Sequence, residues 1–174
     1  MLNHFTIREL EEEDLPKVLH WRNHPKVRSF MLTQHEISFE EHSHWFHKVK
    51  KEKKHHLFIV EEVGQSIGFV QFNRSTDENV ADWGFYASPD APRGTGIKLG
   101  ITSLNHAFAN LKFNKIVGRA FENNEASISM HLRLGFTLEE KLIKNRNNNG
   151  VWLTLHCFGL HLNEWQIQKT KELI

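Results

Sequence analysis

A turn with two glycines stands where the sequence could hold an anion. Ala91-Pro92-Arg93-Gly94-Thr95-Gly96-Ile97 follows an apolar stretch at 80–87 and opens into a long amphipathic pattern. Gly94 and Gly96 lack side chains, so successive backbone N–H groups can point into one concavity, and a helix beginning near Ile97 adds the positive end of its dipole. The turn therefore predicts a site for a phosphate-bearing ligand. The glycine spacing indicates neither a nucleoside-triphosphate loop nor a dinucleotide fold.

The elements that must position this turn are strands and helices in mixed order. Periodicity predicts helices near 15–23, at 38–50, from residue 97 and after residue 124, and strands at 5–10, 56–62, 66–74, 80–87, 115–122, 137–144 and 151–161. Asp14 and Ser38 are suited to cap the first two helices. Val63-Gly64-Gln65 and the Asn-Gly ending of the loop 145–150 predict two hairpins. The chain is expected to form a single domain over residues 1–174.

Further motifs follow the glycine turn in a set order. After the strand near 115–122 come Asn123-Asn124-Glu125-Ala126-Ser127-Ile128 and then Leu134-Gly135-Phe136. With the turn, this series resembles the coenzyme A binding core of the Gcn5-related N-acetyltransferases (GNAT). The resemblance implies an α/β (mixed α+β) GNAT fold, with a central, mostly antiparallel sheet of about seven strands flanked by helices. Its fourth and fifth strands would splay to admit the pantetheine arm. Ala91 departs from the family, which usually has Gln or Arg at that place.

The resemblance also implies an acetyl-CoA-dependent N-acetyltransferase, with acetyl-CoA as co-substrate and no metal. The residues that would bind coenzyme A are Phe85, Tyr86, Ala87, Arg93, Gly94, Thr95, Gly96, Ile97, Asn124, Ser127 and Met130. A backbone N–H near Tyr86 or Ala87 would stabilise the oxyanion, if a local break in the strand frees it. Attack by the amine is usually direct in this family. Cys157 is therefore expected to be a small buried residue and not a nucleophile.

Two residues are candidates for proton transfer. Where the family commonly has a tyrosine that reaches the leaving sulfur, this sequence has His131. Histidine can donate a proton, but burial would favour its neutral form, and the ring could instead pack against coenzyme A. Tyr86 is the sole tyrosine of the chain. Glu122 is the candidate base, acting directly or through a water, and the alternative is an ordinary acid at the end of a strand.

The acceptor side carries a second resemblance. Trp21-Arg22-Asn23-His24-Pro25, then Ile37-Ser38, His42 and Glu122-Asn123-Asn124, is similar to the branch of the family that acetylates the 4-amino group of a UDP-linked amino-dideoxy sugar in pseudaminic acid biosynthesis. The resemblance implies that Arg22, His42 and Arg74 contact this nucleotide-linked amino sugar, and cationic groups suit a diphosphate. Trp83 could form a wall for the sugar ring or belong to the core. Each of these residues alone also fits a structural role.

Other functions are kept as alternatives. A GNAT enzyme could instead acetylate a ribosomal-protein N-terminus, a polyamine or another small amine, and the missing tyrosine leaves a catalytically silent coenzyme A binding module open. A peptide acceptor would predict a neutral or acidic groove in place of the basic set.

Composition restricts the partners. The formal net charge of +1 gives no drive toward nucleic acid, no apolar stretch is long enough to cross a membrane, and a cytoplasmic protein is expected. The single cysteine excludes an internal disulfide framework. His42-x-His44-x-x-His47 lacks the spacing of a helical zinc site, so no metal is expected. A homodimer is left open.

Overall fold

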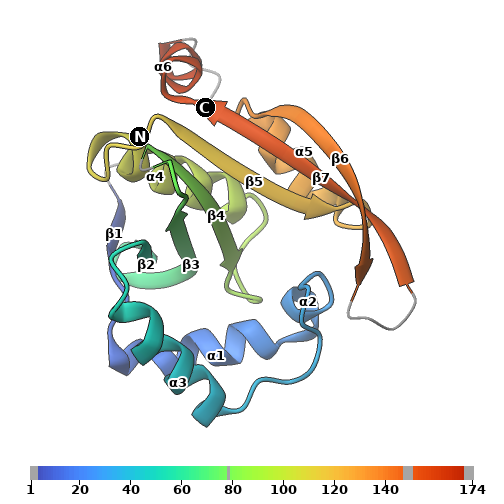
Figure 1. Ribbon diagram of the computed structural model, residues 1–174. Helices are drawn as coiled ribbons and strands as arrows, with labels where there is room; N and C mark the ends of the chain where they lie inside the picture. Colours follow the sequence, from blue (N-terminus) through green and yellow to red (C-terminus); the bar gives the residue numbers. More distant parts are fainter. Residues whose placement is uncertain (1–3, 78, 147–150, 171–174) are drawn as a thin grey trace.

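The computed structural model describes residues 4–77, 79–146 and 151–170 of the chain (Figure 1). The described strands are β1 (Phe5–Glu9), β2 (His55–Glu62), β3 (Gln65–Arg74), β4 (Val80–Ala87), β5 (Lys115–Phe121), β6 (Thr137–Arg146) and β7 (Val151–His161). The described helices are α1 (Leu15–Asn23), α2 (Pro25–Arg28), α3 (Phe39–Lys50), α4 (Thr95–Ala109), α5 (Glu125–Arg133) and α6 (Leu162–Thr170), with a short 3-10 helix, η1 (Glu12–Asp14). The mixed α/β architecture predicted from the sequence is confirmed.

The described strands form one sheet in the order β1-β2-β3-β4-β5-β7-β6. Neighbours pair antiparallel except β4 and β5, which run parallel. The parallel pairing runs from Val80 opposite Lys115 to Asp82 opposite Val117, and no further pair of these two strands is found in the described chain. Figure 1 shows the two strands diverging beyond this point. The predicted splay is therefore confirmed, and it opens the sheet at its centre.

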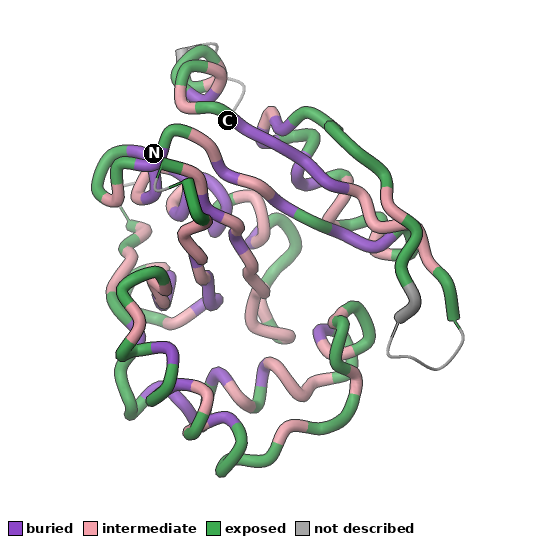
Figure 2. The backbone as a smooth tube through the Cα atoms, in the orientation of Figure 1, coloured by how far each residue is buried: buried purple, intermediate pink, exposed green. Residues whose placement is uncertain are grey.

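Alternation along the strands produces two cores. Phe58 and Val60 of β2 pack into the cluster beneath α4, while Ile59 between them packs against α1 and α3 on the opposite face. Successive side chains of a strand point to opposite faces, so both faces of β2 must be apolar to be covered in this way. Figure 2 shows the buried residues concentrated in the central strands and α4, whereas much of the β6–β7 hairpin is intermediate or exposed.

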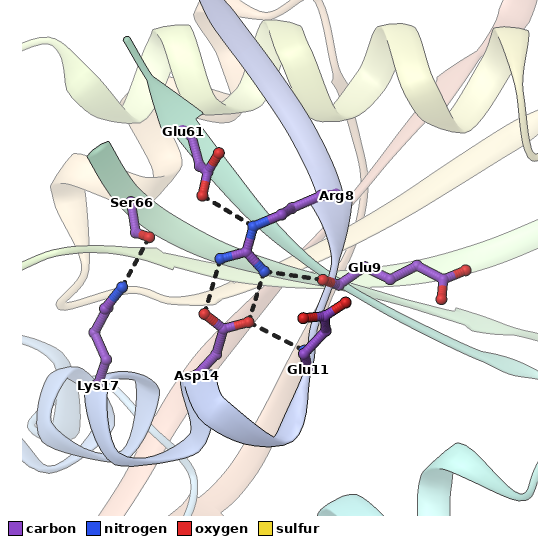
Figure 3. Close-up of polar contacts among 7 residues, drawn as sticks. All are labelled: Arg8, Glu9, Glu11, Asp14, Lys17, Glu61 and Ser66. Carbon is purple, nitrogen blue, oxygen red and sulfur yellow. Dashed lines mark hydrogen bonds and ion pairs between the residues drawn. The ribbon is translucent and has the colours of Figure 1, made fainter. Parts of the chain in front are cut away.

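The helix ends follow local chemistry, with one difference from the sequence prediction. The Ser38 hydroxyl accepts from the backbone N–H of Glu41 (3.1 Å) and caps α3, as expected. Asp14 does precede α1, but its carboxylate turns away and binds Arg8 and the backbone N–H of Glu11 instead (Figure 3). Charge pairing thus outcompetes capping at this position.

The second predicted hairpin forms between β6 and β7, which pair from Thr137 opposite Gly159 to Arg146 opposite Val151. The residues at the tip of its loop, 147–150, lie outside the described residues. The α2 turn after Pro25 was not predicted. It begins there because the His24 ring accepts from the backbone N–H of Lys26 (3.2 Å) and caps the new turn.

Candidate active site

The glycine turn leads directly into α4. Gly94 has φ +90°, a conformation that other residues rarely adopt, and a side chain there would meet open space. The glycine is therefore required by backbone geometry and not by lack of room. Thr95 closes the turn by donating its hydroxyl to the carbonyl oxygen of Pro92 (2.8 Å). The Thr95 N–H bonds to the Pro92 carbonyl oxygen and the Ile97 N–H to that of Gly94, so Gly96, which lines the adjoining cavity, is the first-turn residue whose amide has no backbone acceptor in the described chain.

A cavity of about 460 Å³, called here the glycine-turn cavity, adjoins this turn. Nine of the predicted coenzyme A residues line it: Phe85, Tyr86, Ala87, Gly94, Gly96, Ile97, Asn124, Ser127 and Met130. Arg93 and Thr95 are not part of the lining; Arg93 is exposed and Thr95 is buried. Lys26 and Arg133 line the cavity and were missed by the sequence reasoning, because cations near helix ends are usually solvated. The cavity thus combines helix amides with two cations.

A second cavity of about 470 Å³, called here the arginine cavity, lies on the face covered by α1 and α3. Its described lining includes Arg22, His42, Trp83 and Arg119, with Gln71 on β3. The β3–β4 register sets Gln71 opposite Gly84, where a Cβ would lie 3.2 Å from the Gln71 amide nitrogen. The Gln71 amide therefore lies close to the Gly84 backbone, and both residues line the cavity.

Two cationic or ionisable groups of the arginine cavity are incompletely paired. Arg22 Nη2 donates to the carbonyl oxygen of Thr33 (2.9 Å), but its buried Nη1 has no hydrogen-bond partner in the described part of the chain. His42 stacks on Trp45 with ring centroids 5.2 Å apart, and its buried Nε2 is likewise without a partner among the described residues. Buried polar groups are ordinarily hydrogen-bonded, so both atoms indicate places where a ligand group belongs.

Burial sets the electrostatics of this pair. It lowers the pKa of Arg22, and it lowers the pKa of His42, with the nearby Arg22 charge as a second cause. His42 is therefore held neutral near pH 7, whereas an arginine stays charged in any case. Burial also raises the pKa of the Tyr86 hydroxyl well above its ordinary value, so that this phenol stays protonated.

The two cavities meet along one wall. Phe85, Tyr86, Asn124 and Ser127 line both of them, together with Phe30 and Met31 from the segment after α2. The Asn124 side chain accepts from the backbone N–H of Ser127 (3.2 Å) and caps α5, which fixes both residues at this wall. A molecule in one cavity can therefore touch a molecule in the other at the point where β4 and β5 diverge.

The predicted break in β4 is absent from its pairing with β3, which continues without a register shift from Gly68 opposite Ala87 to Arg74 opposite Ala81. A free amide arises in another way. The Ser88 N–H donates to the carbonyl oxygen of Ile67 in β3 (2.8 Å), so alternation directs the Ala87 N–H to the opposite side, where β5 has diverged. The splay itself therefore directs a donor toward the shared wall.

His131 lies under the shared wall and lines the arginine cavity, with 1% of its surface exposed. Its Nε2 accepts from the Trp83 indole N–H (3.1 Å) and its Nδ1 is 2.8 Å from the Ser127 carbonyl oxygen, so the ring proton is on Nδ1. Burial lowers the pKa of His131 to about 4. Trp83 is also 6% exposed and belongs to the core, although it lines the cavity. This placement does not favour His131 as an acid near neutral pH.

Two predicted residues lie away from the cavities. Glu122 directly follows β5, and its carboxylate accepts from the backbone N–H of Thr154 on β7 (2.8 Å). Arg74 lies at the far end of β3, with its guanidinium 4.6 Å from the centre of the Phe113 ring. Neither residue lines the arginine cavity or the glycine-turn cavity. The geometry therefore does not support Glu122 as the base or Arg74 as a nucleotide contact.

Arg119, which the sequence reasoning did not select, lines the arginine cavity, whereas Arg74 does not. It lies on β5 just beyond the last β4–β5 pair, forms an ion pair with Asp82 of β4, and lines the arginine cavity. The signal was present in the sequence as a charged residue within the otherwise apolar run Ile116 to Phe121. A lone cation within a strand next to the predicted splay could have been taken as a site residue.

The described residues contain no helix that is both long and apolar enough to cross a membrane. They also contain no group of three or more His, Cys, Asp or Glu side chains that could hold a metal ion. Cys157 is a free, buried thiol on β7.

Comparisons with known proteins agree with this geometry. The model of the acetyltransferase (GNAT) domain family matches residues 4–137. The chain is 31% identical over 140 residues to acetyltransferase PseH of Campylobacter jejuni strain 81-176, covering 80% of this chain and 86% of the relative. PseH of strain NCTC 11168 is 29% identical over 133 residues, covering 76% and 83%.

Solved structures show the same fold. Spermidine N-acetyltransferase from Vibrio cholerae, in complex with CoA and spermine, superposes with a TM-score of 0.84 at 21% identity, covering 94% of this chain and 98% of that one. The yncA acetyltransferase from Salmonella typhimurium with acetyl-CoA gives a TM-score of 0.73 at 23% identity, covering 92% and 95%. At this identity the likeness extends to the fold and not to the acceptor.

Proposed function

Because the chain belongs to the GNAT acetyltransferase family and is an acetyl-CoA-dependent N-acetyltransferase, we propose that its acceptor is a UDP-linked amino sugar. The reaction would place an acetyl group on the 4-amino group of UDP-4-amino-4,6-dideoxy-N-acetyl-altrosamine, in pseudaminic acid biosynthesis. One observation carries this proposal: the buried Arg22 Nη1 and His42 Nε2 lack partners in the described chain, and both residues line one cavity. The similarity to PseH supports it.

The charge of the arginine cavity separates this acceptor from a polyamine. Arg22 and Arg119 contribute two cations to the lining, and Glu41 is the carboxylate among the described lining residues. Glu41 itself lies 3.2 Å from the His35 ring. A polyamine carries several positive charges and would be repelled by such a wall, whereas a diphosphate would be attracted to it.

Acetyl-CoA is assigned to the glycine-turn cavity. The α4 amides and Gly94 suit a pyrophosphate, and Lys26 and Arg133 supply countercharge. The thioester would then extend between the diverging strands toward the wall that both cavities share. We propose that the single domain over residues 1–174 holds both substrates in this way, and that a homodimer is its assembly; sedimentation measurements test the latter.

The chemistry at the shared wall needs few protein groups. The neutral amine attacks the thioester carbonyl carbon, the C–N bond forms, the C–S bond breaks, and coenzyme A departs as a thiolate. The proton that the amine loses passes to solvent, from which the thiolate can be protonated. We assign the Ala87 N–H as the oxyanion donor, because the splay frees it on this side. Thiols have a pKa of about 8.5, so the thiolate is a reasonable leaving group without an acid. An acid role for His131 and a base role for Glu122 stay predictions, and their placements weigh against both.

A competition between acceptors tests the proposal. Purified protein is given acetyl-CoA and either the UDP-linked amino sugar, the same amino sugar without UDP, spermidine or an N-terminal peptide, and coenzyme A release is measured. We expect kcat/KM to be highest for the UDP-linked sugar by more than about 100-fold, because the diphosphate contacts charged hydrogen-bond donors. Faster turnover of spermidine would overturn the acceptor assignment. Binding of coenzyme A without turnover of any amine would indicate a silent binding module.

A further inference from the structure

His131 joins three elements at the point where the sheet opens. Its ring stacks on Phe158 of β7 with centroids 4.9 Å apart, and it accepts a hydrogen bond from Trp83 of β4 while donating to Ser127 of its own helix. The edges of Phe85 and Phe136 complete the surroundings, at 5.9 and 5.0 Å between centroids. Among the described residues, each group contacting the ring is aromatic or a neutral polar atom. Both ring nitrogens are therefore engaged in structure.

β5, which faces β4 across the opening, has a glycine next to the Trp83–His131 hydrogen bond. A Cβ at Gly118 of β5 would overlap His131 Nε2 and would come within 2.7 Å of Trp83 Nε1. The Trp83–His131 hydrogen bond can therefore exist only because β5 has no side chain at this position. Gly118 also follows Val117, the last β5 residue that pairs with β4.

We infer that His131 is a positioning residue that fastens α5 to β4 and thereby holds open the coenzyme A slot, the space between the diverging strands β4 and β5. His131 does not donate a proton to the leaving thiolate. Ser127 and Asn124, one helical turn or two before His131, line the wall shared by both cavities. The Trp83–His131–Ser127 chain fixes that turn relative to Phe85 and Ala87 on β4. A neutral ring whose Nε2 lone pair is already occupied has no proton to offer in that direction. This inference rests on the acetyl transfer reaction but not on the identity of the acceptor.

Two substitutions separate the positioning role from the acid role. His131→Gln keeps an acceptor for Trp83 and a donor for the Ser127 carbonyl but cannot act as an acid. His131→Phe keeps the ring packing and loses both hydrogen bonds. If His131 positions the slot, His131→Phe should raise the KM for acetyl-CoA about 10-fold, since two hydrogen bonds of roughly ordinary strength are lost, while His131→Gln should stay within about 3-fold of the wild type in KM and kcat.

The Trp83→Phe variant provides an independent arm, because it removes the indole donor and leaves His131 in place. It should reproduce the rise in KM seen with His131→Phe, and coenzyme A binding measured by calorimetry should weaken in parallel in both. The pH profile of kcat in the wild type should contain no limb that disappears in His131→Gln. Thermal melting of each variant monitors folding.

The opposite pattern would overturn the inference. An equal, roughly 100-fold fall in kcat for His131→Gln and His131→Phe at unchanged coenzyme A affinity, with Trp83→Phe near the wild type, would assign His131 the acid role. Because calorimetry with coenzyme A needs no acceptor, a wrong acceptor assignment would leave these binding results unaffected.

Discussion

Arg8 and Arg22 are two arginines that lie within the same fold and are treated differently by it. Arg8 donates to both oxygens of Asp14 at 2.6 and 2.8 Å and to Glu61 at 2.9 Å, and it reaches the Glu9 carbonyl oxygen as well (Figure 3). Arg22 is more deeply buried, and within the described chain it donates a hydrogen bond to the Thr33 carbonyl oxygen while its Nη1 has no partner. The first guanidinium is complete without a ligand, and the second is not.

The pKa shifts of the two arginines distinguish a structural ion pair from a binding group. The carboxylates raise the pKa of Arg8, and Arg8 holds the pKa of Asp14 below its usual range, so each charge stabilises the other. Burial lowers the pKa of Arg22, and the favourable interactions with Tyr86 and Glu41 do not offset that effect. An uncompensated buried charge destabilises the free protein, and such strain is retained where a ligand relieves it. The histidines repeat the contrast, since both ring nitrogens of His131 have partners and Nε2 of His42 has none among the described residues.

The largest expected effect is on acceptor binding when Arg22, the incompletely paired arginine, is replaced. Arg22→Met should raise the KM for the UDP-linked acceptor about 30- to 100-fold, or about 2 to 3 kcal/mol, because a charged donor is lost from the arginine cavity. The free energy of unfolding should change by less than about 0.5 kcal/mol, since the removed charge was poorly compensated. Steady-state kinetics with both substrates and urea unfolding measure the two quantities.

Arg28→Met is the matched control, because Arg28 lies on the adjacent α2 and forms an ion pair with Glu36 (3.5 Å) outside both cavities. It should leave both KM values unchanged. A rise in the KM for acetyl-CoA in Arg22→Met would mean that the segment held by the Thr33 hydrogen bond had collapsed, and the binding interpretation would fail.

The next effect concerns the paired histidine and acid. The pKa of His131 is lowered to about 4 in the folded protein, while an unfolded histidine titrates near about 6.5. The unfolded state therefore takes up the proton first as the pH falls, and stability is lost between these two values. Between pH 7 and pH 5 this group alone should cost about 2 kcal/mol.

Urea unfolding of the wild type and His131→Phe at both pH values isolates that contribution, because the other titrating groups are shared by the two proteins. The variant should lose about 2 kcal/mol less than the wild type on acidification. An identical pH dependence would show that His131 titrates normally and that its buried, neutral placement is wrong.

The sequence allowed much of the coenzyme A site to be predicted, but less of the acceptor site. The turn at Gly94 and the Asn124 cap were predictable because they depend on local backbone chemistry, which neighbouring residues determine. The mostly antiparallel sheet of about seven strands and its splay followed from the resemblance. Turns and helix caps of this kind depend little on tertiary contacts, so the folded chain keeps them as predicted.

The differences between the expected and the observed placements concern side chains whose direction depends on distant strands. Glu122 turns to Thr154 because β7 pairs with β5 there, and Arg74 ends on the Phe113 ring because β3 extends past the cavity. Asp14 binds Arg8, six residues earlier, across the turn that η1 makes. Arg119 faces the cavity because of strand alternation beyond the last β4–β5 pair. None of these partners is adjacent in the sequence, so periodicity cannot identify them.

A smaller effect tests the complete network. Arg8→Met should lower the free energy of unfolding by about 1.5 kcal/mol, because Asp14 keeps 8% exposure and loses its partner, while the 37% exposure of Arg8 reduces the loss through solvent screening. Both KM values should stay unchanged. The exposed Lys17, which bonds to Ser66 at 3.0 Å, gives the control Lys17→Met with no measurable loss. A changed acceptor KM in Arg8→Met would erase the distinction between the two regions.

The smallest effect should have opposite signs for binding and stability. His42→Leu fills similar volume and removes a buried ring nitrogen that has no partner in the described chain, so the free energy of unfolding should rise by about 0.5 to 1 kcal/mol. The acceptor KM should rise about 5-fold, or about 1 kcal/mol, because a neutral hydrogen bond is lost. His47→Leu on the same helix is the control, since the His47 ring is half exposed and already lies 2.8 Å from the Ser43 carbonyl oxygen. It should change neither quantity. A destabilised His42→Leu with normal acceptor binding would place His42 with Arg8 among the structural groups, and the orphaned nitrogen would then carry no information about the ligand.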